Sequence, residues 1–136
     1  MADREHRLEE EYRLIATVFP TVVRSEDWFL VPDDVRAKRH GWTPDLFPVA
    51  FHAQPEHPGQ VPYGIYVASC ALVGGQSPNN FSADASNRPP FEGKWGVLSW
   101  QGDNSGTPWV PTQQIEEGAN LLNFLITFEE RFKDGV

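Results

Sequence analysis

The sequence predicts an α+β domain in which a helix near each end of the chain packs on an antiparallel sheet. Apolar residues recur at helical spacing near both ends, and the segments between them are rich in β-branched and aromatic residues. No crossover helix separates these strand-like segments, so they are expected to pair as an antiparallel meander. A chain of 136 residues can bury one sizeable core, and residues 1–136 are therefore predicted to form a single domain.

The first helix is predicted over Leu8–Phe19. Its apolar stripe recurs at steps of four, three and four residues and consists of Leu8, Tyr12, Ile15 and Phe19. Pro20 ends the helix because proline disfavours the α conformation in the residue before it. The acidic run Glu9 to Glu11 falls largely off the stripe, and we expect it to lie in solvent, as we do for Asp33 and Asp34.

Strand-like segments follow, bounded by Pro, Gly, Asp or Asn. They are Trp28–Val31, Phe47–His52, Ile65–Cys70 and Trp95–Trp100. The longest irregular stretch, Gly74 to Lys94, separates the last two, and a loop of about 20 residues in a compact domain tends to be functional or mobile. We therefore expect a four-stranded meander with one long loop.

The closing helix is predicted over Ile115–Phe132, after a stop at Pro111. Its buried face consists of Leu121, Leu122, Leu125, Phe128 and Phe132. Gly118 costs about 1 kcal/mol relative to alanine inside a helix, so we expect another backbone to pass close to it.

The composition excludes several classes of function. A formal net charge of −8 argues against a nucleic-acid partner and favours a protein partner with a basic surface. No apolar run approaches the roughly 20 residues of a membrane span. One cysteine permits no internal disulfide, which is typical of a reducing compartment, and we expect an acidic cytoplasmic protein. The four histidines lack zinc-site spacing and no phosphate-binding loop is present, so neither a metal nor a cofactor is predicted.

Short motifs spread over most of the chain resemble a known family. They are Phe19-Pro20, Trp28 to Pro32, Gly41-Trp42, His57-Pro58, Pro62 to Val67, Trp95, Leu98 to Gln101 and Trp109 to Pro111. Together they resemble the ubiquitin-conjugating (UBC-like, or RWD) fold, and most closely a bacterial branch of it. The resemblance implies a helix–meander–helix domain that works beside an activating enzyme, a ubiquitin-like modifier and a metal-dependent isopeptidase. The family commonly has histidine where Gln101 stands, and glutamine cannot exchange a proton near neutral pH.

The chain lacks a thiol where the resemblance would place the catalytic one. Catalytic members of the family carry a His-Pro-Asn motif followed by the cysteine, and here Ser77, Pro78 and Asn79 are followed by Asn80 and no cysteine. This segment is either a remnant of that motif or a plain turn, and we favour the turn because asparagine tolerates left-handed conformations.

Cys70, the single cysteine, lies in an apolar run directly after Ile65 to Ser69. A nucleophilic thiol must be exposed and activated by a base, a cation or a helix N-terminus. None of these occurs among the neighbours of Cys70 in the sequence. We therefore expect a buried, unreactive thiol, since unpaired cysteine is among the most buried residue types.

The aromatic residues suggest a binding surface. Trp42 lies beside the basic residues Arg39 and His40 and is our first choice for a partner anchor, because tryptophan is enriched in interface hot spots. The remaining binding residues that we propose from the sequence are Pro78, Asn79, Asn80, Trp100, Gln101 and Trp109.

Two function classes follow from these patterns. The first is a non-catalytic UBC-like module that binds a modifier or a conjugation enzyme. The second is an active transferase that carries a ubiquitin-like modifier as a thioester on Cys70. A stand-alone α+β protein whose resemblance is limited to the fold is a third possibility, because fold does not fix function.

Overall fold

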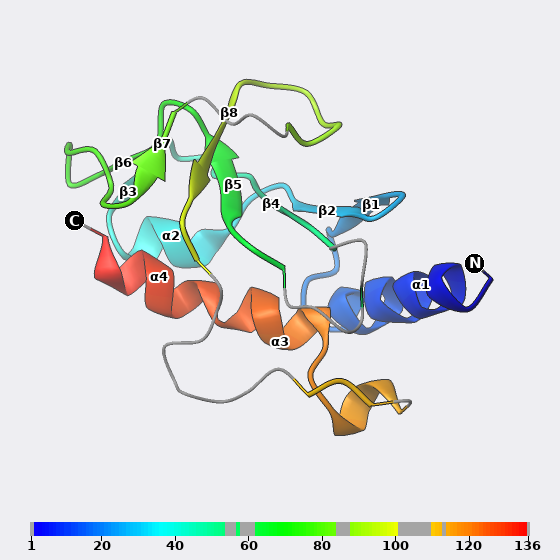
Figure 1. Ribbon diagram of the computed structural model, residues 1–136. Helices are drawn as coiled ribbons and strands as arrows, with labels where there is room; N and C mark the ends of the chain where they lie inside the picture. The colour runs from blue at the N-terminus through cyan, green and yellow to red at the C-terminus, as the bar shows by residue number, and fades with distance from the viewer. Residues whose placement is uncertain are drawn as a thin grey trace.

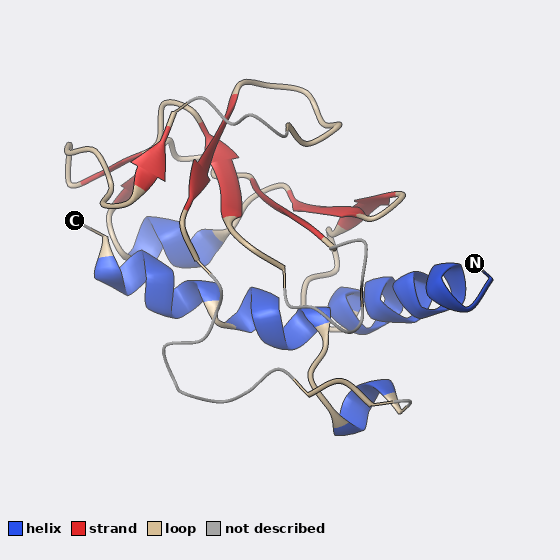
Figure 2. Ribbon diagram, viewed as in Figure 1, coloured by secondary structure: helices blue, strands red, loops and turns tan. Residues whose placement is uncertain are grey.

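The computed structural model describes residues 2–53, 57, 62–83, 88–100, 110–112 and 114–135, without the side chains of residues 2, 3 and 116. The fold is α+β, as predicted, with an antiparallel sheet, an N-terminal helix and C-terminal helices. Figures 1 and 2 show the sheet as one layer and the helices gathered on a single side of it. This arrangement places the N-terminal helix, α1 (Ala2–Ala16), beside α3 (Leu121–Ile126).

The main sheet has six described strands where the sequence predicted four. Its order is β1-β2-β4-β5-β8-β7, and every neighbouring pair is antiparallel. The strands are β1 (Val23–Ser25), β2 (Trp28–Val31), β4 (Val49–His52), β5 (Ile65–Ala68), β7 (Phe81–Ser82) and β8 (Trp95–Leu98). The predicted strands correspond to β2, β4, β5 and β8. The two additional strands lie at the edges of the sheet, and they are too short to show a period of two in the sequence.

A separate pair of short strands and a short helix lie outside the main sheet. β3 (Trp42–Thr43) and β6 (Leu72–Val73) form a separate two-stranded sheet, and α2 (Val35–Arg39) comes just before β3. The long stretch Gly74 to Lys94 is not wholly irregular, because β7 lies within it.

The predicted C-terminal helix is divided into three pieces. A 3₁₀ turn, η1 (Ile115–Glu117), precedes α3 and then α4 (Phe128–Asp134). Asn120 starts α3 because its side chain accepts a hydrogen bond from the N–H of Asn123, and the Asn123 side chain returns the bond to Asn120. Gly118 lies between η1 and α3, outside both of them. The close backbone predicted beside it is present, since a Cβ there would come within 2.7 Å of the Val110 carbonyl oxygen.

The core fills the space between the sheet and the helices. It includes the predicted stripe residues Leu8 and Ile15 and the helix face residues Leu121, Leu125, Phe128 and Phe132. Phe51 on β4 packs edge-to-face against Phe124 of α3 and Phe128 of α4. These contacts hold both helices against the sheet. The other sheet face carries a smaller cluster of Trp28, Ala50, Tyr66 and Trp95. Across the described part of the chain, every helix is too short or too polar to cross a membrane.

Candidate functional site

The Pro78–Asn80 segment (the Pro-Asn loop) enters β7 and is held against the end of α4. The N–H of Asn79 donates to the carbonyl oxygen of Gly135 at 2.9 Å, and its side-chain amide donates to Asp134 at 3.4 Å. Arg131 also donates a short hydrogen bond to the carbonyl oxygen of Asn79. The loop is therefore fixed by three contacts to the C-terminal helix.

Asn80 turns the chain into β7. Its φ of 47° is left-handed, a conformation that asparagine tolerates, so this segment forms the turn that the sequence predicted. The carbonyl oxygen of Asn80 accepts a hydrogen bond from the N–H of Ser99 at 3.0 Å, which joins the loop to the end of β8.

A groove of about 300 Å³ lies where this turn meets the sheet. Its described lining consists of Tyr63, Asn80, Phe81, Ser82, Val97 and Ser99. Tyr63 is 47% exposed, and its hydroxyl shares a hydrogen bond of 2.6 Å with the hydroxyl of Ser99. The groove lining thus contains two aromatic rings, hydroxyls and an amide, which suit apolar contact and hydrogen bonding.

Trp100 lies in the core next to the groove residue Ser99. It is 7% exposed, and its indole N–H donates to the hydroxyl of Thr127 at 3.1 Å. Its carbonyl oxygen accepts from the N–H of Gly64, the residue after Tyr63. Trp100 is therefore a support rather than the contact surface that we expected, while Gln101 and Trp109 lie outside the described residues.

Arg131 connects the loop to the core. The guanidinium lies over the ring of Trp42, with its central carbon 6.0 Å from the ring centroid. Burial lowers the pKa of Arg131 below its usual value, and the nearby charge of Asp134 only partly opposes this shift. Among the described residues, neither its Nη1 atom nor the side-chain oxygen of Asn79 has a hydrogen-bond partner.

Cys70 is exposed, so the prediction of a buried thiol is wrong. β5 ends at Ala68, two residues before the predicted strand end, and Cys70 lies in the turn closed by a hydrogen bond from the Ala71 N–H to the Ala68 carbonyl oxygen. The alternation of side chains along β5 therefore does not extend to Cys70.

Cys70 and the groove lie at opposite ends of the same strand pair. Ile65 pairs with Leu98 at the groove end, and Ala68 pairs with Trp95 at the thiol end. A four-residue strand rises roughly 13 Å, so the thiol does not enter the groove.

Trp42 is buried, so the prediction of an exposed partner anchor is wrong. The residue is 2% exposed, and its indole N–H donates to the carbonyl oxygen of Phe132 at 2.9 Å. Its ring packs edge-to-face against Phe47 and Phe132. The sequence could not distinguish this core position from a surface one because the polar neighbours of Trp42 lie on the adjacent turn.

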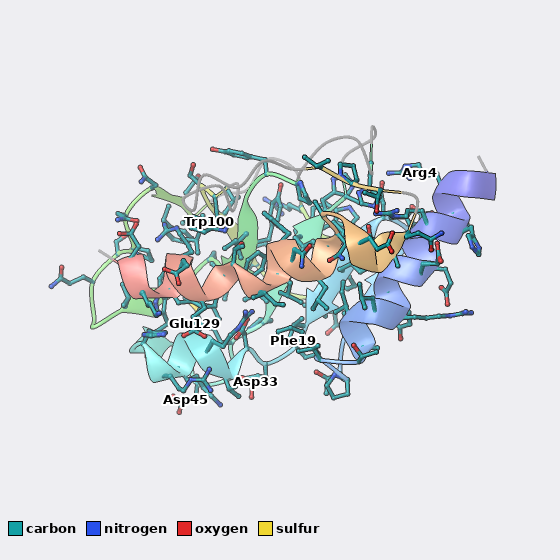
Figure 3. All side chains as sticks on the ribbon, turned by 90° about the horizontal axis from the view of Figure 1, so that it is seen from below. Arg4, Phe19, Asp33, Asp45, Trp100 and Glu129 are labelled. Carbon is teal, nitrogen blue, oxygen red and sulfur yellow. The ribbon has the colours of Figure 1, made fainter. Side chains whose placement is uncertain are left out.

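Arg39 and His40 both contact Glu129 on α4, which Figure 3 labels between α4 and α2. Arg39 lies 3.6 Å from this carboxylate, and His40 makes a shorter contact. The hydrogen bond to His40, helped by the charges of His40, Arg39 and Arg36, lowers the pKa of Glu129, while burial opposes the shift. Arg39 and His40 therefore join the end of α2 to α4, on the side of the sheet that the helices cover.

A buried network on α1 was not predicted. Glu11 is fully buried, and its carboxylate accepts from Arg7 at 3.2 Å and from the N–H of Leu121 at 3.0 Å. The Nε2 atom of His57 lies 2.9 Å from the same carboxylate, although neither ring nitrogen makes an aligned hydrogen bond within the described part of the chain. The sequence held a signal, because Glu11 lies three residues after Leu8 and four before Ile15, on the apolar stripe.

Asp34 is likewise buried, where the sequence predicted a solvated residue. Its side chain caps α2 by accepting from the N–H of Arg36 at 3.0 Å. It also pairs with the Arg36 guanidinium through two hydrogen bonds of 2.9 and 2.6 Å. Arg36 in turn donates to the carbonyl oxygen of Leu125 at 2.9 Å, which ties α2 to the end of α3.

Within the described residues, no three His, Cys, Asp or Glu side chains are grouped so as to hold a metal ion. Comparisons of the chain with protein-family models, with curated proteins and with solved structures find no match. The groove and the exposed thiol are therefore the features of the described residues that bear on function.

Proposed function

We propose that the protein is a non-catalytic ubiquitin-conjugating-enzyme-like module that binds a modifier or an activating enzyme of a bacterial ubiquitin-like conjugation system. The observation that carries this proposal is the separation of the groove beside the Pro-Asn loop from the thiol. The groove is lined by hydroxyl, amide and aromatic groups, and Cys70 lies at the other end of the β5–β8 pair.

The chemistry of the groove favours binding over transfer. Thioester formation needs a thiolate at the transfer site, and a serine or tyrosine hydroxyl is a weak nucleophile without an adjacent base. The Tyr63 hydroxyl shares a hydrogen bond with another hydroxyl, that of Ser99. Tyrosine and asparagine are instead well suited to adaptable protein contacts.

The attachment of the loop also supports a binding role. Asn79 and Asn80 are tied to α4 and β8 by backbone hydrogen bonds, so the groove is formed before a partner arrives. A preformed surface loses less conformational entropy on association than one that must be ordered.

The test is complex formation with a ubiquitin-like modifier and an activating enzyme of a bacterial conjugation system. Binding measured by calorimetry is expected to weaken at least tenfold in the Tyr63→Ala and Asn80→Gly variants. The matched control is Leu46→Ala, because Leu46 is an exposed residue away from the groove lining. Binding by the wild type that these groove variants leave unchanged would reject the groove as the contact site.

A transferase that uses Cys70 is the second candidate, and one observation favours it. The thiol is exposed in a turn, as a carrier of a thioester requires. This mechanism predicts a modifier adduct that reductant removes and that Cys70→Ala abolishes. The position of Cys70 away from the Pro-Asn loop makes this architecture unlike the one that the resemblance implies.

A further inference from the structure

A second pocket, of about 280 Å³, lies at the thiol end of the β5–β8 pair. Its described lining is Ser69, Ala83, Arg88, Lys94 and Trp95. Two of these five side chains are cationic and none is acidic, in a chain whose formal net charge is −8.

The walls of this pocket are held by the sheet. The N–H of Ser69 donates to the carbonyl oxygen of Lys94 at 2.9 Å, next to the paired residues Ala68 and Trp95. The Trp95 side chain is buried, and its indole N–H donates to the carbonyl oxygen of Phe91 at 3.0 Å. The Trp95 side chain is therefore held in place, and its indole N–H is already hydrogen-bonded to Phe91.

Gly93 gives Lys94 its position. Its φ of 116° is a conformation that residues with a side chain rarely adopt, and this turn brings the chain from Phe91 into β8. The turn places Lys94 beside the end of β5, where its carbonyl oxygen accepts from the Ser69 N–H.

Lys94 differs from the other lysines of the chain. Lys38 pairs with Asp33 at 3.3 Å and Lys133 with Glu130 at 3.7 Å, whereas Lys94 makes no ion pair with any described residue. An ammonium with no carboxylate partner among the described residues, in a pocket that Arg88 and Ser69 also line, can form charge-assisted hydrogen bonds to an anion.

We infer that this pocket binds a small oxyanion, either a phosphate or a carboxylate group, through Lys94, Arg88 and Ser69. Trp95 supplies a flat apolar wall for the group that carries the anion. This inference is independent of the proposed function, because the pocket and the groove lie at opposite ends of β5 and β8.

The test is a titration of the full chain with inorganic phosphate and, separately, with sodium acetate, followed by nuclear magnetic resonance of backbone amides and tryptophan indoles. Saturable shifts are expected at the Ser69 amide and the Trp95 indole, and Lys94→Gln is expected to weaken binding about fivefold, as for the loss of one exposed charge contact. The control Lys133→Gln should bind as the wild type does. A response to phosphate alone identifies a phosphate site, and a response to acetate alone identifies a carboxylate site. The absence of saturable shifts with either anion, or equal affinity in Lys94→Gln and the wild type, would overturn the inference.

Discussion

The fully buried carboxylate of Glu11 accepts a hydrogen bond of 3.0 Å from the backbone N–H of Leu121, 110 residues further along the chain. This bond occupies an N–H at the start of α3 that has no partner within the helix. The same carboxylate pairs with Arg7, whose guanidinium also donates to the carbonyl oxygen of Thr112 at 2.7 Å. The Glu11–Arg7 pair therefore holds α1, the segment before η1 and the start of α3 together.

Glu11→Leu is expected to destabilise the protein by about 3–5 kcal/mol, because it leaves the buried charge of Arg7 without its partner. Urea unfolding followed by circular dichroism measures the loss. The double variant Arg7→Met/Glu11→Leu should recover part of it, because both charges are then removed. A single variant as stable as the wild type would contradict the buried network.

Asp34→Ala is expected to lower the free energy of unfolding by about 2–4 kcal/mol. The substitution removes the cap of α2 and leaves the Arg36 guanidinium buried without its carboxylate. Asp45→Ala is the matched control, since Asp45 is exposed and lies outside this contact. Equal unfolding midpoints for the two variants would show that the Asp34–Arg36 pair has no such role.

Gly96→Ala is expected to move β7 and to cost about 1–3 kcal/mol in stability, as overpacking does. A Cβ at Gly96 would come within 2.7 Å of both the Phe81 ring and the Ser82 carbonyl oxygen. Adding Phe81→Ala should relieve the ring clash and restore part of the stability, which thermal unfolding can follow. If Gly96→Ala unfolds at the wild-type temperature, the close packing of β7 on β8 is incorrect.

The contact of Glu129 with His40 predicts a dependence of stability on pH. Because the folded protein lowers the pKa of Glu129 below its usual 4.5, the carboxylate stabilises the fold above that value. This contribution is lost as the pH falls below 4.5 through the lowered pKa. Glu129→Gln should be less stable than the wild type near pH 6, and the difference should shrink at low pH. Denaturant unfolding at several pH values measures it, and a difference that grows on acidification would contradict the assignment.

Cys70 is expected to react rapidly with a thiol reagent in the native protein, because its side chain is exposed in a turn. Cys70→Ser should change the stability by less than about 0.5 kcal/mol, as surface substitutions usually do. Labelling that is slow until urea is added would instead indicate a protected thiol.

The sequence predicted the elements with a strong periodic pattern. The helix stripe and the strands β2, β4, β5 and β8 show their period over four or more residues, and the structure contains them. It did not predict β1 and β7, which have three and two residues and pair only at the sheet edges. The break before α3 depends on the reciprocal bonds of Asn120 and Asn123, which an unbroken apolar pattern conceals.

The candidate site was predicted only in part. The Pro-Asn loop lies beside a groove, but Trp42 and Trp100 are buried because each finds a hydrogen-bond acceptor for its indole N–H inside the fold. The sequence did not predict Tyr63 and Ser99 as site residues, because they are 36 positions apart and only the pairing of the strands brings them into contact. Cys70 was misplaced because a strand that ends two residues early turns its side chain from the sheet to the surface.

The central claim is that the protein binds its partner without forming a thioester. The most direct measurement incubates the wild type with an activating enzyme and a ubiquitin-like modifier of a bacterial conjugation system and with ATP, followed by electrophoresis with and without reductant. The account predicts no reductant-sensitive adduct and a stable complex that Tyr63→Ala weakens. An adduct that reductant removes and that Cys70→Ala abolishes would contradict it.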